Sequence, residues 1–168
     1  NKDFDQAKIY FKKLENQSQT GTIQDLLSTS LNAWINFKDI NSALLGLESF
    51  PSAFNNIKNI QEVFLYCYFD SNQTDEAFNK LTTDPKINYS RYYYFHASYL
   101  ISKKKEKKAE DLLKSSLKTY PTNLILKQLL TDLNRGQKTE DQFDCKKSNH
   151  VIAEIIYIIA NGLSSRSD

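Results

Sequence analysis

The fold is decided by residues 90–123, which read SRYYYFHASYLISKKKEKKAEDLLKSSLKTYPTN. Residues 90–102 and 106–119 each predict an amphipathic helix, because apolar side chains recur there at spacings of three and four. Pro121 ends the second helix, since a helix rarely continues into the residue before a proline. The segment therefore predicts a helical hairpin. The two apolar stripes are Tyr93, His96, Ala97 and Leu100, then Ala109, Leu112, Leu113 and Leu117.

A run of lysines falls where this hairpin must turn. The pattern of aromatic residues followed by lysines is also found in proteins that bind nucleic acid, with stacking rings and phosphate-binding ammonium groups. The whole chain has a net charge of only +2, so no strong field directs it toward nucleic acid. We interpret the run as a solvated turn between helices. It comprises Lys103, Lys104, Lys105, Lys107 and Lys108.

The hairpin recurs along the chain. An alanine that opens a second-helix stripe stands at Ala7, Ala43, Ala77 and Ala109. A small side chain is expected where two packed helices cross, because it permits close approach. Predicted first helices precede three of these alanines, at residues 22–37, 56–69 and 90–102, which indicates a repeat architecture.

The best-defined hairpin resembles the tetratricopeptide repeat, whose pattern is W-x2-L-G-x2-Y, then A-x3-F, then P within 34 residues. Here the same spacing is occupied by Tyr93-x2-His96-Ala97-x2-Leu100, Ala109-x3-Leu113 and Pro121. The resemblance implies an all-α, right-handed superhelical solenoid of antiparallel helix pairs in a single domain, 1–168. The expected parts are repeats 22–54, 56–88 and 90–123, half-repeats 2–14 and 150–168, a degenerate helix 123–136 and an irregular insertion 136–150.

Both half-repeats lack a partner helix in this interpretation. Residues 2–14 and 153–163 would then each expose an apolar stripe, and we expect a neighbouring chain or self-association to cover at least one of them. The stripe of the second segment is expected at Ile156, Ile159, Ala160 and Leu163.

Patterns that carry catalytic or metal chemistry are weak. Cys67 and Cys145 belong to no paired motif, so we expect two free thiols. Cys145 and His150 would give only two ligands of the four that zinc requires. His96 lies on the apolar stripe and is interpreted as a core residue. We therefore expect no enzyme activity, no metal and no cofactor. No stretch is long enough to span a membrane, and no compartment is indicated. The chain reads as an excerpt of a longer one.

In the tetratricopeptide family, one face of each first helix lines a concave groove that holds ligands. The resemblance implies that the chain is a protein–protein interaction module binding a peptide or helical segment of an unidentified partner. The alternatives are a nucleic-acid-binding helical repeat, and a spacer or oligomerisation arm of a larger protein. A clamp for a terminal carboxylate is not expected. The groove residues would be Asp25, Ser28, Asn32, Asn59, Glu62, Tyr66, Arg91, Tyr94, Ser98, Glu154, Tyr157 and Asn161.

Overall fold

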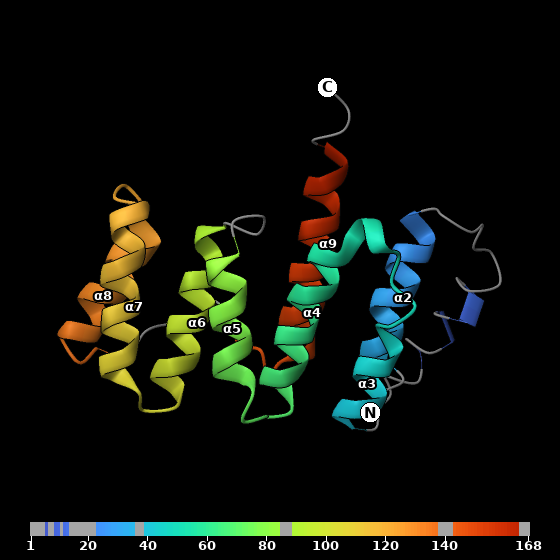
Figure 1. Ribbon diagram of the computed structural model, residues 1–168, viewed down its shortest axis with the longest axis horizontal. Helices are drawn as coiled ribbons and strands as arrows, with labels where there is room; N and C mark the ends of the chain where they lie inside the picture. Colours follow the sequence, from blue (N-terminus) through green and yellow to red (C-terminus); the bar gives the residue numbers. More distant parts are fainter. Residues whose placement is uncertain are drawn as a thin grey trace. The chain divides into compact units, whose positions relative to one another are not determined.

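The structure, a computed structural model, describes residues 23–35, 39–84, 89–137 and 143–164, together with Gln6, Ile9, Tyr10, Lys12 and Lys13. Every regular element in these ranges is helical, so the all-α prediction is confirmed (Figure 1). The elements are α2 (Ile23–Ile35), α3 (Ile40–Gly46), the 3-10 turn η1 (Ser52–Phe54), α4 (Asn55–Tyr68), α5 (Thr74–Thr83), α6 (Ser90–Ser102), α7 (Glu106–Thr119), α8 (Leu124–Asn134) and α9 (Ser148–Ser164).

Side-chain caps define where two of these helices begin. Asp39 caps α3: its carboxylate accepts a hydrogen bond from the backbone N–H of Ser42 at 2.9 Å, and its own N–H donates to the Ser42 hydroxyl at 3.2 Å. That backbone hydrogen bond also holds the pKa of the Asp39 carboxyl below its ordinary value. Asn123 caps α8 by accepting from the N–H of Leu126 at 3.0 Å. Each cap satisfies a backbone donor that the first turn leaves without a helical partner.

Three helices end in the same way. The residues after α4, α6 and α8 include Asp70, Lys104 and Gly136, with φ values of 59°, 57° and 63°. At each of them the backbone N–H groups turn back onto the last helical carbonyls; for example, Lys105 N donates to Leu100 O at 2.9 Å. These left-handed residues lie 34 and 32 positions apart in the sequence, which matches the predicted repeat period.

Lys104 occupies a backbone conformation that costs a residue with a side chain about 1 kcal/mol. We expect Lys104→Gly to raise the free energy of unfolding by about 0.5–1 kcal/mol, because glycine adopts this conformation without a steric penalty. The measurement is urea unfolding followed by circular dichroism. Ser115→Gly, at an exposed position in the middle of α7, serves as the opposite control, because a glycine in a helix interior destabilises. Loss of stability in both variants would contradict the role assigned to this helix end.

The chain divides into two compact units, which we describe separately. Unit 1 comprises the residues up to Asn72 and those from Cys145 onward, and unit 2 comprises Gln73–Asp144. The boundary falls between α4 and α5, inside the predicted repeat 56–88. Stacking of all repeats into one right-handed superhelix therefore stays a prediction.

In unit 1, four helices form a closed ring of contacts: α2 with α3, α3 with α4, α4 with α9, and α9 with α2. Trp34 of α2 is fully buried in this unit, with its ring 5.7 Å from that of Tyr68 in an edge-to-face arrangement. Gln61 of α4 donates from Nε2 to the Ser30 hydroxyl of α2 at 3.0 Å. The core thus joins α2 to α4 directly, and α9 completes the ring (Figure 1).

This ring differs from the arrangement expected for residues 153–163. In a solenoid each repeat contacts only its neighbours along the chain, whereas α9 contacts α2, far upstream. Val151, Ile155 and Ile159 are buried there, so the inner stripe of α9 is not bare. Of the stripe expected for this segment, Ile159 is buried, whereas Ile156 and Ala160 are exposed. The expected stripe is therefore covered only in part by α2 and α4, and its cover by a neighbouring chain stays a prediction.

Unit 2 is built from α5, α6, α7 and α8. Contacts run from α5 to α6, from α6 to α7, from α7 to α8, and from α6 to α8, so each helix packs on its neighbours in sequence. The hydroxyl of Tyr93 in α6 donates to the backbone carbonyl of Thr82 at the end of α5, at 2.6 Å. Asn123, ahead of α8, donates to the Ser90 hydroxyl at 3.0 Å. These bonds tie successive hairpins together at their ends.

The alanines expected at helix crossings differ in how deeply they are buried. Ala43 and Ala109 are buried, but Ala77 is only half-buried. The reason is that the next residue of α5, Phe78, takes the interior position and stacks on the His96 ring with centroids 5.0 Å apart. Ala7 lies outside the described residues, as does most of the predicted half-repeat 2–14, of which Ile9 and Tyr10 are helical and exposed.

Ala109 offers a test of close helix packing. We expect Ala109→Leu to lower the free energy of unfolding by about 1–3 kcal/mol, because the side chain has no exposed area and the added carbons must displace packed neighbours. Ala77→Leu is the matched control, since the half-buried position has room at its open side. Thermal or urea unfolding of both variants measures the difference. Equal losses at the two positions would contradict the packing described for α6 and α7.

Candidate functional site

The groove residues predicted on α2 and α4 lie at the surface of unit 1. Asp25, Ser28 and Asn32 are all half-buried along one face of α2, and the Ser28 hydroxyl donates to the backbone carbonyl of Asp25 at 3.1 Å. On α4, Asn59 is exposed, whereas Glu62 and Tyr66 are half-buried. Glu62 forms an ion pair with Lys58, one turn earlier, at 3.7 Å. The two helices therefore present polar side chains with one partly open tyrosine ring.

On α6 the prediction is partly wrong. Tyr94 was expected as an exposed anchor, but only 7% of it is accessible. Its ring packs edge-on against that of Phe95, at 6.2 Å between centroids, and Phe95 in turn stacks on Phe143 at 3.8 Å. The physical reason is that α6 contacts three helices, so little of its circumference remains open. Arg91 and Ser98 stay half-buried on the same helix.

The residues predicted on α9 separate into two faces. Glu154 was expected to face solvent but is buried, on the side of α9 that carries Val151 and Ile155. The spacing of residues alone could not show whether Glu154 lies on the buried or on the solvent-exposed side of the helix. Tyr157 and Asn161 are exposed, as expected, and the Asn161 amide donates to the Tyr157 carbonyl at 3.0 Å.

The exposed side of α9 carries large apolar side chains and, among the side chains that the structure describes, no charged one. Ile156 and Tyr157 are 50% and 51% exposed, on a helix that also has a buried stripe. Ile156 was expected in the packing stripe, but its spacings of three from Ala153 and four from Ala160 place it on their exposed side of the helix. We call this surface the outer face of α9. It consists of Ala153, Ile156, Tyr157, Ala160 and Asn161, which are all exposed.

Two lysines of the α6–α7 turn, Lys105 and Lys107, are engaged by carboxylates within unit 2. Lys105 Nζ lies 2.5 Å from Asp75 Oδ2, and this hydrogen bond raises the pKa of the Lys105 ammonium above its ordinary value. Lys107 lies 3.2 Å from carboxylate oxygens of both Glu110 and Asp111, and these hydrogen bonds likewise raise its pKa. Such exposed pairs contribute little to stability. The paired carboxylates do, however, offset the positive charge of Lys105 and Lys107, which binding to a phosphate backbone would need.

His96 is a buried side chain of α6 with an unusual electrostatic environment. Its ring stacks nearly parallel on Phe78, and its Nδ1 atom has no hydrogen-bond partner. Burial lowers the pKa of the imidazole to about 4, more than the nearby Asp75 carboxylate raises it. The Lys105 and Lys108 ammonium groups lower it further. His96 is therefore neutral at pH 7 and acts as an aromatic core residue.

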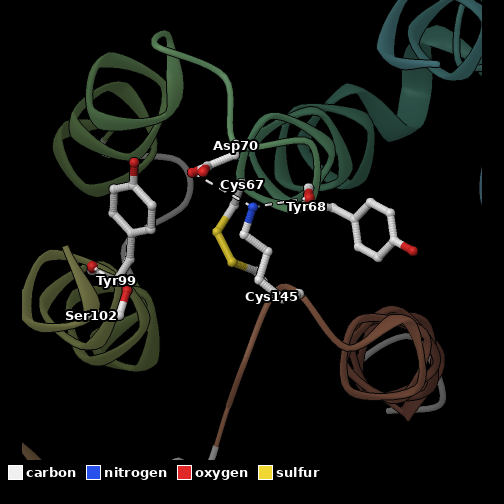
Figure 2. The surroundings of a disulfide bond; sticks show 7 residues. Cys67, Tyr68, Asp70, Tyr99, Ser102 and Cys145 are labelled. Atoms are coloured by element: carbon white, nitrogen blue, oxygen red, sulfur yellow. Dashed lines mark hydrogen bonds and ion pairs between the residues drawn. A yellow bond between two sulfur atoms is a disulfide. The ribbon is translucent and has the colours of Figure 1, made fainter.

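Cys67 and Cys145 form a disulfide, so the expectation of two free thiols was wrong (Figure 2). Their Cα atoms are 5.9 Å apart, within the range that a disulfide requires. Cys67 lies in the last turn of α4, and Cys145 lies in the turn before α9. The pairing could not be read from the sequence, because 78 residues separate the two and no local motif joins them.

The ammonium group of Lys146 lies at the same end of α4. It donates to the backbone carbonyl of Tyr68 at 3.1 Å and forms an ion pair with Asp70 at 3.6 Å (Figure 2). Asp70 is the left-handed residue that ends α4, so the segment ahead of α9 is held both covalently and by charge.

Comparison with known proteins adds no assignment: no protein-family model, curated protein or solved structure matches the chain. Within the described ranges, no three or more histidine, cysteine, aspartate or glutamate side chains are grouped so that they could hold a metal ion. None of the described helices has the length and apolar character needed to cross a membrane.

Proposed function

We propose that the chain is a non-enzymatic protein–protein interaction module that binds a helical segment of a partner protein. The observation that carries this proposal is the outer face of α9, where Ile156 and Tyr157 stand half-exposed with no charged residue among them. Large apolar side chains exposed together on a folded surface are typical of binding sites. Tyrosine is also enriched among the residues that contribute most to protein interfaces.

The chemistry of this face favours a helix as the ligand. Ala153 and Ala160 lie two turns apart with Ile156 between them, so small residues flank a protruding one. A partner helix can approach such a surface closely and pack its own side chains between the ridges. The Tyr157 ring adds contact area at low cost in conformational entropy, and its hydroxyl can reach a polar group of the partner.

We further propose that the hairpins are degenerate repeats of the tetratricopeptide type and that polar residues of α2 and α4 extend the binding surface in unit 1. The recurrence of left-handed residues at Asp70, Lys104 and Gly136 supports the repeat assignment. The half-buried Tyr66 of α4 and its polar neighbours support the extended surface. Binding of nucleic acid by the turn lysines is disfavoured, because Lys105 and Lys107 are already paired with carboxylates.

Replacement of Tyr157 tests this proposal. We expect Tyr157→Ala to weaken binding of a captured partner by more than about 1 kcal/mol, or roughly fivefold, as anchor residues of interfaces do. Stability should change little, since half of the side chain is in solvent. The measurement is a titration of the partner, first captured with the full chain as bait, against each purified variant.

Tyr89 provides the matched control for this titration. It is a tyrosine of similar exposure, 55%, and it lies in unit 2, outside the predicted groove. Tyr89→Ala should leave the affinity unchanged. If Tyr157→Ala and Tyr89→Ala weaken binding equally, or only the second does, the outer face of α9 is not the binding site.

A further inference from the structure

The disulfide closes the loop that contains the whole of unit 2. Unit 1 is formed by two separate stretches of chain, ending at Asn72 and resuming at Cys145, and unit 2 is the intervening Gln73–Asp144. Cys67 lies five residues before the first stretch ends, and Cys145 is the first residue of the second. Apart from this bond, the only covalent connection between α4 and α9 is the polypeptide of unit 2.

Within unit 1, α9 buries one apolar stripe against its neighbours. Val151, Ile155 and Ile159 are buried against the ring formed with α2 and α4, while the outer face is in solvent. The Lys146 contacts with Tyr68 O and Asp70 add an exposed hydrogen bond and an exposed ion pair, which contribute little by themselves. Bringing the two ends of a long chain segment together costs conformational entropy. The disulfide keeps the ends together, so docking of α9 carries this cost only when the bond is reduced.

We propose that Cys67–Cys145 is a redox-controlled clasp: reduction by a dithiol allows α9 to leave its position against α2 and α4, and reoxidation returns it. In the opening step, a thiolate of the dithiol attacks one protein sulfur and forms a mixed disulfide while the other protein sulfur leaves as a thiolate. The second thiol of the reductant then displaces the remaining protein sulfur. Two electrons pass to the protein, which ends with two thiols, and the reductant ends as a disulfide.

The geometry indicates which sulfur is attacked. Cys67 is fully buried in α4, whereas Cys145, in the turn before α9, is buried with 7% of its surface accessible. Attack therefore occurs at Cys145, and Cys67 is the leaving group. The Lys146 ammonium, placed at the end of α4 by Tyr68 O and Asp70, favours the negative charge that develops there. This clasp does not depend on the proposed function, although it would control whether the outer face of α9 is presented.

The test is hydrogen exchange on the full chain, measured by mass spectrometry in the oxidised state and after treatment with dithiothreitol. We expect protection of peptides from residues 148–164 to fall by more than about tenfold on reduction, as local opening becomes easier. Peptides from residues 106–119 in α7 serve as the internal control and should lose much less protection than those of α9. Alkylation with iodoacetamide before denaturation reports how much of the disulfide was reduced in the folded chain.

Three outcomes would overturn the clasp. In the first, α9 keeps its protection from hydrogen exchange although alkylation shows two free thiols. In the second, α7 loses as much protection as α9, which would mean general unfolding. Alternatively, the disulfide could be reduced only after denaturant is added, so that no folded open state exists. The same exchange experiment on Cys145→Ser, without reductant, should reproduce the reduced pattern, and an oxidised pattern in that variant would also overturn the proposal.

Discussion

Replacing both cysteines with alanine is expected to lower the free energy of unfolding by about 4 kcal/mol. The bond joins residues 78 positions apart, and a cross-link of that span removes a large share of the conformational entropy of the unfolded chain in the chain-entropy account of disulfides. The measurement is urea unfolding of the oxidised wild type and of the Cys67→Ala/Cys145→Ala variant, followed by circular dichroism.

Wild-type chain unfolded in the presence of dithiothreitol is the control for this comparison. It keeps both side chains and lacks only the covalent bond, so it separates the cross-link from any loss of packing around Cys67. We expect the reduced wild type and the double variant to have closely similar midpoints. A double variant as stable as the oxidised wild type would contradict the structural role given to the disulfide.

Acid is expected to destabilise the fold through His96. The folded pKa of about 4 lies below the ordinary value of 6.5, so the unfolded chain binds a proton that the folded chain rejects. The contribution of His96 to the free energy of unfolding is therefore fully present above about pH 6.5. It is lost as the pH drops toward 4, which lowers stability by up to about 3 kcal/mol from this group alone. Urea midpoints measured between pH 7 and pH 4 give the slope.

The variant His96→Phe isolates this contribution. A phenyl ring keeps the stack on Phe78 and cannot bind a proton, so the remaining slope comes from carboxylates such as Glu110, whose pKa is lowered by the hydrogen bond from Lys114. We expect the difference between wild type and variant to grow steadily below pH 6.5. A wild type and variant with parallel pH profiles would show that His96 is protonated in the folded state.

Local sequence patterns were sufficient for the helices. The predicted hairpin 90–123 corresponds to α6 and α7, because apolar spacing, the turn lysines and Pro121 act over a few residues. The helix expected at 123–136 is found as Leu124–Asn134, begun by the Asn123 cap. Within the described part of 136–150, the irregular segment runs to Lys147, and α9 then begins at Ser148, earlier than the stripe at 153–163 suggested.

Features set by distant parts of the chain were not predictable in this way. The contact of α9 with α2 and the pairing of Cys67 with Cys145 each join two stretches of chain that unit 2 separates in the sequence. No local pattern marks such contacts. The burial of Tyr94 depends on how far α6 is rotated about its axis, and one residue of helix corresponds to about 100°. Of the predicted groove residues on α9, Tyr157 and Asn161 are exposed as expected, whereas Glu154 is not.

The most direct test of the interaction-module account is hydroxyl-radical footprinting of the chain with and without its captured partner. Tyr157 and Tyr89 have closely similar exposure in the free chain, so their side chains should be oxidised at comparable rates. With the partner bound at saturation, we predict that oxidation of Tyr157 and Ile156 falls while that of Tyr89 stays unchanged. If Tyr157 remains as reactive in the complex as in the free chain, the outer face of α9 does not bind the partner.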